Sequence, residues 1–330
     1  MDIEKWSLRV GVTALACAVL FRLGSNGVFH TAAQALVTPE TMAVMMFLES
    51  GRVVRPAPVA VPEKTEPLEQ QQDSYKEPVA QAVFAQMDAN LVEVNSYCGI
   101  DPDVPAMIQR PLSWNLQQEK PTVLIVHSHG SESYKKTEDY EESSAYRTLN
   151  RDYNMISVGA EVKKVLEAGG IEVIHDTTMH DQPSYSDSYN HSRKSVKEYL
   201  KAYPSICLVL DLHRDAVENK DGKQVAVTAK YNGKTAAQLM LVVGTDVRLS
   251  HPDWPENMSL AVKLHAQLEK NFPGICRPIS FRSQRFNQDL CSGALLVEVG
   301  SAGNTREEAL EAARVLGRTI LELSKGAVAQ

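Results

Sequence analysis

The stretch Val123-Leu-Ile-Val-His-Ser-His-Gly-Ser-Glu-Ser-Tyr134 indicates both the fold class of this chain and its candidate site. Its first four residues are apolar and mostly β-branched, which predicts a short strand buried on both faces. His127, His129 and Glu132 follow at the point where this strand ends. Side chains two residues apart on a strand share a face, so the two histidines can point the same way. Two imidazoles and a carboxylate at the end of a buried strand indicate half of a metal site.

Apolar strands alternate with amphipathic helices from residue 122 onward. The predicted strands are 122–126, 171–174, 206–212, 238–243 and 294–299, and the predicted helices are 154–168, 191–203, 257–271 and 305–325. This alternation predicts an α/β domain with a mixed, mostly parallel central sheet flanked by helices on both faces.

The composition limits the classes of function. The chain has 330 residues, 43% of them hydrophobic and 23% charged, which is enough to bury a sizeable core. Its formal net charge of −7 argues against nucleic acid as the main partner. The 5 cysteines include no C-x-x-C spacing, so a zinc ribbon and a thioredoxin-type motif are both excluded. Whether Cys276 and Cys291 pair is left open.

The first 84 residues differ in composition from the rest. An uncharged apolar run lies between Arg9 and Arg22, which predicts an export or signal-anchor segment over residues 1–30. Whether that segment is cleaved or retained stays open. Residues 31–84 form a membrane-proximal segment and a proline-rich linker. We therefore expect a catalytic domain over residues 85–330, held away from a membrane surface.

Two further predicted strands also end in polar residues that can carry chemistry. The strand over 206–212 contains Asp211 and is followed by His213, while the strand over 294–299 contains Glu298. Because sites in α/β sheets form at the carboxyl ends of strands, these residues can converge with the first cluster. A catalytic zinc typically takes three protein ligands, and His129, Glu132 and His213 could supply them. Glu298 could then be the base that activates water at the metal.

Each of these residues also has a purely structural interpretation. A single histidine at a strand end is more often a structural residue than a ligand. A carboxylate in an apolar strand requires a cation or a shared proton, and for Glu298 a salt bridge to Arg282 or Arg285 is the simpler explanation. The segment from Arg282 to Gln288 could also clamp a substrate carboxylate or stabilise an oxyanion. Taken together, the three strand ends favour the metal site.

The sequence lacks the motifs of several common enzyme classes. It contains no Gly-x-Ser-x-Gly elbow, no Walker loop and no dinucleotide fingerprint. This absence weakens the serine hydrolase, ATPase and Rossmann interpretations.

Four blocks of residues resemble one known family. They are His127-Ser-His-Gly-Ser-Glu-Ser-Tyr134, His175-Asp-Thr-Thr, Asp211-Leu-His-Arg-Asp215, and Asn287-Gln-Asp-Leu followed by Leu296-Val-Glu-Val-Gly300. In this order, across roughly residues 85–325, they resemble the stage II sporulation protein P family. Gly130 departs from the family pattern, which often has a larger polar residue at that position.

The resemblance implies a zinc-dependent N-acetylmuramoyl-L-alanine amidase with an amidase-like fold, and also endopeptidase activity on peptide cross-links. It implies a single-pass membrane anchor with the catalytic domain outside the cytoplasm, in the intermembrane space at the sporulation septum. It further implies a role in septal peptidoglycan thinning and engulfment, in a complex with the sporulation proteins called D and M. The family pattern maps the zinc ligands onto His129, Glu132 and His213 and the base onto Glu298.

Substrate contacts are expected from four residues around this group, His127, Arg214, Arg285 and Asn287. Two other classes of function stay open. A zinc metallopeptidase of stem peptides could use the same residues, and a non-catalytic wall-binding scaffold could keep the fold without a metal.

Overall fold

The protein is described as a computed structural model over residues 87–112, 114–141 and 145–326. The predicted anchor (1–30) and linker (31–84) lie outside these residues. Within the described part of the chain, no helix is both long and apolar enough to cross a membrane.

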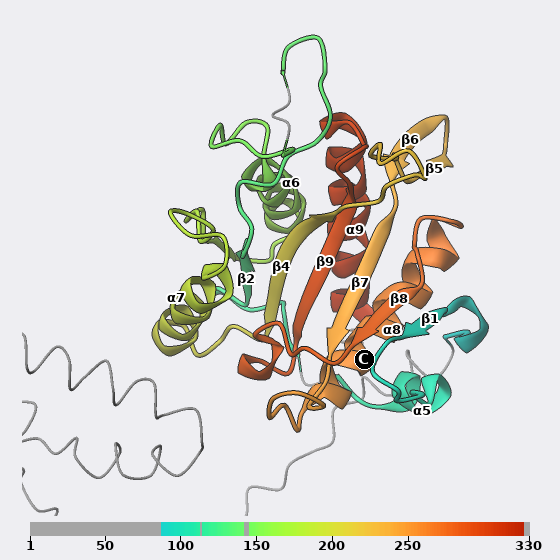
Figure 1. Cartoon of the computed structure of the whole chain (residues 1–330). Helices are drawn as coiled ribbons and strands as arrows, with labels where there is room; N and C mark the ends of the chain where they lie inside the picture. Colours follow the sequence, from blue (N-terminus) through green and yellow to red (C-terminus); the bar gives the residue numbers. More distant parts are fainter. Residues whose placement is uncertain (1–86, 113, 142–144, 327–330) are drawn as a thin grey trace, which may run out of the picture. The chain divides into compact units, whose positions relative to one another are not determined.

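A seven-stranded sheet forms the centre of the domain (Figure 1). In spatial order its strands are β1 (Val94–Ser96), β8 (Ile279–Arg282), β7 (Leu239–Gly244), β9 (Ala294–Ser301), β4 (Leu208–Asp215), β2 (Val123–Val126) and β3 (Val173–His175). Neighbouring strands are parallel except for β7 and β9, which are antiparallel. The predicted mixed, mostly parallel sheet is therefore confirmed.

Helices cover the two faces of this sheet unequally. The helices are α5 (Val104–Gln109), α6 (Met155–Ala168), α7 (Ser188–Ala202), α8 (Trp254–Asn271) and α9 (Arg306–Gly326). In β9, Leu295, Val297 and Val299 belong to the large core that contains residues of α6, α8 and α9. On the opposite face, α7 packs over β2 and β4. Beside it, Leu296 packs with Met240 and with the partly buried Tyr189 and Phe286. The less covered face leaves room for a site.

Several elements were not predicted from the sequence. They are the short strands β1 and β8, the helix α5, two 3₁₀ turns (Ala89–Leu91 and Gln288–Leu290), and a hairpin of β5 (Thr228–Tyr231) and β6 (Lys234–Ala237). The strands among them have only three or four residues, too few for a period-2 pattern to be recognised. β1 and β8 are defined by pairing partners far away in the sequence, and β5 and β6 by pairing with each other across a short turn.

The possible Cys276–Cys291 disulfide does not form. Both cysteines are free, as are Cys98 and Cys207. Cys276 lies beside Leu239, which pairs with Val299 near the carboxyl end of β9, whereas Cys291 precedes the start of that strand. Because strands rise about 3.3 Å per residue, the two thiols are much farther apart than a disulfide spans.

Gly300, near the carboxyl end of β9, has a left-handed backbone conformation and close neighbours. It has a φ of 73°, a region that L side chains rarely adopt. A Cβ atom there would lie 2.7 Å from the Cβ of Ala237 and 2.8 Å from Oδ1 of Asn304. The register between β4 and β9 shifts at this point. The glycine therefore lets β9 pass close to β6 and to the turn that begins α9.

We predict that Gly300→Ala destabilises the domain more than Gly170→Ala. Gly170 has a φ of 87° but no neighbouring atom within 4 Å of its Cβ position, so its substitution costs about 1 kcal/mol for the left-handed conformation alone. Gly300→Ala adds two close contacts to that cost. It should therefore lower the free energy of unfolding by roughly twice as much. Urea unfolding of both variants measures the difference. Equal losses would show that the contacts around Gly300 relax freely.

Candidate metal centre

Three neighbouring strands bring the predicted site residues together on the less covered face of the sheet. His129 and Glu132 lie in the turn that follows β2, His213 lies in β4, and Glu298 lies in β9. His213 and Glu298 are direct partners in the register of β4 and β9. In β4, Leu210 and Leu212 enter the large core. Asp211 and His213 therefore point to the opposite face, since side chains alternate along a strand.

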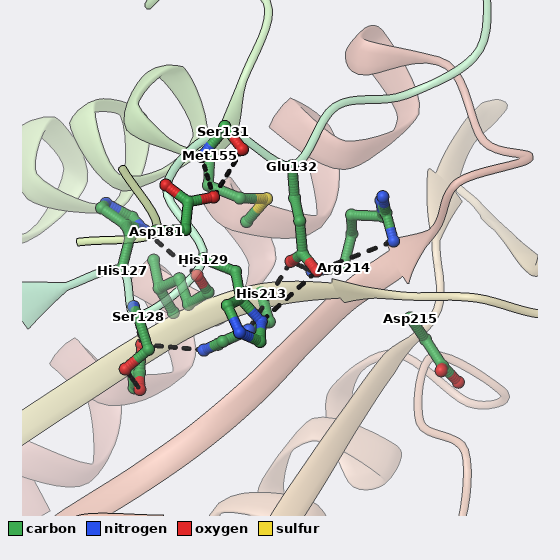
Figure 2. A network of polar contacts seen from close by, with 12 residues as sticks. His127, Ser128, His129, Ser131, Glu132, Met155, Asp181, His213, Arg214 and Asp215 are labelled. Carbon is green, nitrogen blue, oxygen red and sulfur yellow. Dashed lines mark hydrogen bonds and ion pairs between the residues drawn. The ribbon is translucent and has the colours of Figure 1, made fainter. Parts of the chain in front are cut away.

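His129, Glu132 and His213 form a compact set of metal-ligating atoms. One ligand atom from each of the three residues lies within 4.8 Å of the others. Nδ1 of His129 is 3.6 Å from Oε1 of Glu132, and Nδ1 of His213 is 3.5 Å from Oε2 (Figure 2). Two imidazole nitrogens and one carboxylate oxygen are a donor set that suits zinc in a catalytic site. The three residues that the sequence suggested as ligands are thus brought together.

The charges in this set favour a cation between the ligands. Burial and the neighbouring His213 lower the pKa of His129 to about 4, so its imidazole is neutral near pH 7. Burial opposes the charge of His213, but the carboxylates of Asp211 and Glu132 outweigh it and raise its pKa well above the usual value. Burial likewise opposes ionisation of Glu132, yet His213 and Arg214 keep its pKa lowered. The two carboxylates therefore favour a positive charge at this position, which a proton on His213 or a metal cation can supply.

Asp211 fixes the orientation of His213. Nε2 of His213 lies 2.9 Å from Oδ1 of Asp211, which leaves Nδ1 directed toward Glu132. Ser128 holds this carboxylate in turn, because its backbone N–H donates to Oδ1 (2.8 Å) and its hydroxyl donates to Oδ2 (2.6 Å). A carboxylate behind a histidine ligand sets the tautomer and raises ligand basicity. No role for Asp211 was predicted from the sequence, although its spacing of two residues from His213 on a strand was a usable signal.

Arg214 stabilises the candidate metal centre through its contacts with Glu132 and with nearby backbone carbonyls. Its backbone N–H donates to Oε2 of Glu132 (3.2 Å), and its Nη1 lies 3.7 Å from Oε1 of the same carboxylate. Its guanidinium also donates to the carbonyls of Ser133 and Tyr146. Most of the guanidinium is engaged by bonds that hold Glu132 and its loop, while Arg214 also lines the cleft. Asp181 stabilises the same turn by accepting from the N–H and hydroxyl of Ser131.

Glu298 lines the same cleft, and one of its two carboxyl oxygens lacks a hydrogen-bond partner among the described residues. Its Oε2 is buried and has no hydrogen-bond partner among the described residues. Burial raises the pKa of this carboxyl to about 8. The alternative salt bridges do not form, because Arg285 pairs with Asp289 and Arg282 donates to the hydroxyl of Ser280. A buried carboxyl without a partner is costly in a folded protein and is characteristic of a proton-transfer site.

The ligands and Glu298 line one cleft with a volume of about 460 Å³. Its other walls are contributed by Arg147, Tyr185, Tyr189, Arg214, Asp215, Ala216, Met240, Val242, Arg282, Gln284, Phe286 and Leu296. Tyr185 stacks on His129 with ring centroids 4.2 Å apart, and its hydroxyl lies 3.3 Å from Nδ1 of that histidine. The guanidinium of Arg147 lies 3.8 Å from the centre of the Tyr185 ring on the cleft wall. Tyr185 and Tyr189 therefore flank the ligands.

The other three expected substrate contacts do not line this cleft. His127 is fully buried, with Nδ1 3.1 Å from the carbonyl of Leu212 and Nε2 2.8 Å from Nε2 of His175. Arg285 is engaged by Asp289 and by the carbonyl of Ser250. His127 and Arg285 thus lie outside the cleft and are engaged by other residues of the chain.

Asn287 joins two segments instead of facing the cleft. Its Nδ2 donates to the carbonyl of Tyr189 and to the hydroxyl of Ser192, while its Oδ1 accepts from Arg193. The residue has a φ of 60°, which asparagine tolerates better than most residues. Asn287 therefore sets the position of Tyr189 and Phe286, which do line the cleft.

Similar solved structures are cell-wall amidases. The amidase AmiC2 of Nostoc punctiforme is 14% identical, with a TM-score of 0.36, and the match covers 61% of this chain and 96% of that chain. The CwlD amidase of Clostridioides difficile, solved with the GerS lipoprotein, is 12% identical with a TM-score of 0.38, covering 63% and 98%. Both TM-scores are below 0.5, so the family assignment rests on sequence.

Sequence similarity identifies the family. Stage II sporulation protein P of Bacillus subtilis (strain 168) is 27% identical over 265 residues, which are 74% of this chain and 61% of that protein. The sequence model of the family described as Stage II sporulation protein P (SpoIIP) matches residues 46–321. The matched region includes every residue of the metal centre, and this chain belongs to the SpoIIP family.

Proposed function

We propose that this protein is a peptidoglycan hydrolase, a zinc-dependent N-acetylmuramoyl-L-alanine amidase that thins the septal wall during sporulation and engulfment. One observation carries the proposal: in a member of the SpoIIP family, a His-Glu-His group lies in the same cleft as Glu298, whose buried Oε2 has no hydrogen-bond partner among the described residues. Endopeptidase activity on peptide cross-links is a second proposed activity of the same site.

The residues of the candidate centre fit zinc. His129 is neutral, Glu132 is ionised, and His213 is oriented by Asp211 so that Nδ1 is available. These three residues would hold the ion. When bound, zinc polarises a scissile carbonyl and lowers the pKa of water to about 7.

Glu298 supplies the proton transfer in this proposal. Its carboxylate takes a proton from the attacking water and passes it to the nitrogen of the leaving L-alanine. The raised pKa, about 8, makes it a good donor in the second step. Leu296, Met240 and Phe286 line the cleft near this carboxyl and limit the water around it.

We further propose that residues 1–30 anchor the chain in the membrane and that the catalytic domain acts outside the cytoplasm, in the intermembrane space at the sporulation septum. The apolar run between Arg9 and Arg22 and the proline-rich linker support this arrangement. Peptidoglycan is the proposed substrate, and the sporulation proteins D and M of the engulfment complex are the proposed partners.

We predict that Glu298→Gln keeps stoichiometric zinc and loses turnover by roughly 10²–10⁴-fold, because the amide cannot accept the proton. The variant should be at least as stable as the parent, since it removes a carboxyl that is costly to bury. Turnover, metal content and urea unfolding are the measurements. Glu256→Gln, which changes a carboxylate outside the cleft, is the control. Normal turnover of Glu298→Gln would exclude Glu298 as the base.

We predict that Asp211→Asn weakens zinc binding by roughly 10–100-fold, because His213 loses the carboxylate that orients it. Asp176→Asn is a matched control: Asp176 is also buried and lies 3.0 Å from a histidine, His180, that is not among the candidate ligands. Competition with a chelating dye measures the affinity, and circular dichroism checks folding. Equal zinc affinity in both variants would show that Asp211 does not position a ligand.

Analysis of digested wall tests the reaction itself. An amidase releases free stem peptides that begin with L-alanine, whereas a metallopeptidase leaves shortened stems attached to the sugar. We expect the first product, its loss after chelation, and its return when zinc is added. A wall-binding scaffold would give neither product, and wall clearing that survives chelation would contradict the metal proposal.

A further inference from the structure

A second hollow, larger than the metal cleft, lies beyond the carboxyl ends of β4 and β9. Its volume is about 920 Å³, against about 460 Å³ for the metal cleft. Three stretches of chain line it: residues 135–136 and 145–147 after β2, residues between 214 and 226 at and beyond the end of β4, and residues 302–303 after β9. We call this hollow the basic groove.

The basic groove and the metal cleft share part of their lining. Arg147, Arg214 and Ala216 contribute to both. Arg214 also contacts the ligand Glu132 through its backbone N–H, so the boundary between the two hollows lies beside the metal centre. A substrate bound at the metal can therefore extend directly into the groove.

The groove is strongly cationic in a chain whose net charge is −7. Its charged lining consists of the cations Lys135, Lys136, Arg147, Arg214 and Lys223 and the single carboxylate Glu218. Some of these charges are already engaged, because Lys136 pairs with Glu141 and Arg214 lies near Glu132. Lys135 and Lys223 are exposed and make no ion pair with another described residue. They face a space that favours anions.

The walls of the groove are held in place by one side chain. Oδ1 of Asn304 accepts from the backbone N–H groups of Val227 and Ser301, and its Nδ2 donates to the carbonyl of Val227. The carbonyl of Asn304 accepts from the N–H of Lys135. Beside it, Gly303 packs so closely that a Cβ atom would lie 2.4 Å from the backbone of Val225. The groove is therefore a preorganised surface, which lowers the cost of binding an extended ligand.

We propose that the basic groove binds the acidic stem peptide of the substrate, with the free carboxylates of the peptide against Lys135 and Lys223. This inference rests on the proposed function, because the stem peptide begins at the amide that the metal centre would cleave. The continuity of the two hollows favours a peptide over a separate phosphate-rich polymer, which would have no reason to reach the metal centre. The groove thus sets the direction in which the substrate lies across the sheet edge.

The test uses the full-length zinc enzyme and the double variant Lys135→Gln/Lys223→Gln. Two muropeptides serve as substrates, one with free stem carboxylates and one with those carboxylates amidated. We expect the double variant to lower kcat/KM for the acidic substrate by roughly tenfold, mainly through KM, and to change the amidated substrate little. The loss should shrink as salt is raised. Lys201→Gln, in the last turn of α7 and outside both hollows, is the control.

Binding of the free acidic stem peptide, measured by calorimetry, separates this inference from the proposed function. If the parent cleaves neither substrate but binds the peptide more tightly than the double variant does, the groove assignment stands and the amidase proposal fails. If the parent cleaves both substrates and the double variant matches it on each, the groove assignment is overturned. Binding of poly(glycerol phosphate) but not of the peptide also overturns it.

Discussion

The pairing of β4 with β9 is the constraint on which the site depends. The parallel register puts His213 directly beside Glu298, and the alternation of side chains sends both to the less covered face of the sheet. A slip of β9 by one residue would turn Glu298 into the core against α6 and α9 and would bring Val297 to the less covered face instead. The apolar residues of the two strands therefore fix the position of the chemistry, because only one register buries them.

Polar groups on this face are stabilised to very different degrees. Asp211 accepts three hydrogen bonds and Glu132 is surrounded by His213 and Arg214, so both stay ionised although they are buried. Glu298 receives no such support at Oε2. Asp211 and Glu132 hold the ligands in position, whereas Glu298 is suited to exchange a proton. A full set of hydrogen bonds would fix the protonation state of Glu298. Among these three carboxyl groups, only Glu298 has a buried oxygen without a hydrogen-bond partner in the described part of the chain.

The long, periodic elements could be predicted from the sequence, and so could the three residues whose potential ligand atoms lie together in the cleft. The strands around Val123 and Leu208 and the helices α6 and α9 follow from apolar patterns, and His129, Glu132 and His213 follow from the rule that sites form at strand ends. The substrate contacts were less predictable. Arg285, Asn287 and His127 are polar residues near the site in sequence. Backbone carbonyls distant along the chain engage them, those of Ser250, Tyr189 and Leu212 respectively. Such partners are set by tertiary packing, which no local pattern encodes.

The same reasoning explains why the basic groove was not visible in the sequence. Its lysines come from loops after different strands, where a lysine is ordinarily a solvated surface residue. They become a site only because Asn304 joins the loop after β2, the segment before β5 and the end of β9. Gly300 and Gly303 permit that close approach at the end of β9. The turn that begins α9 thus organises the groove, as the β4–β9 register organises the metal centre.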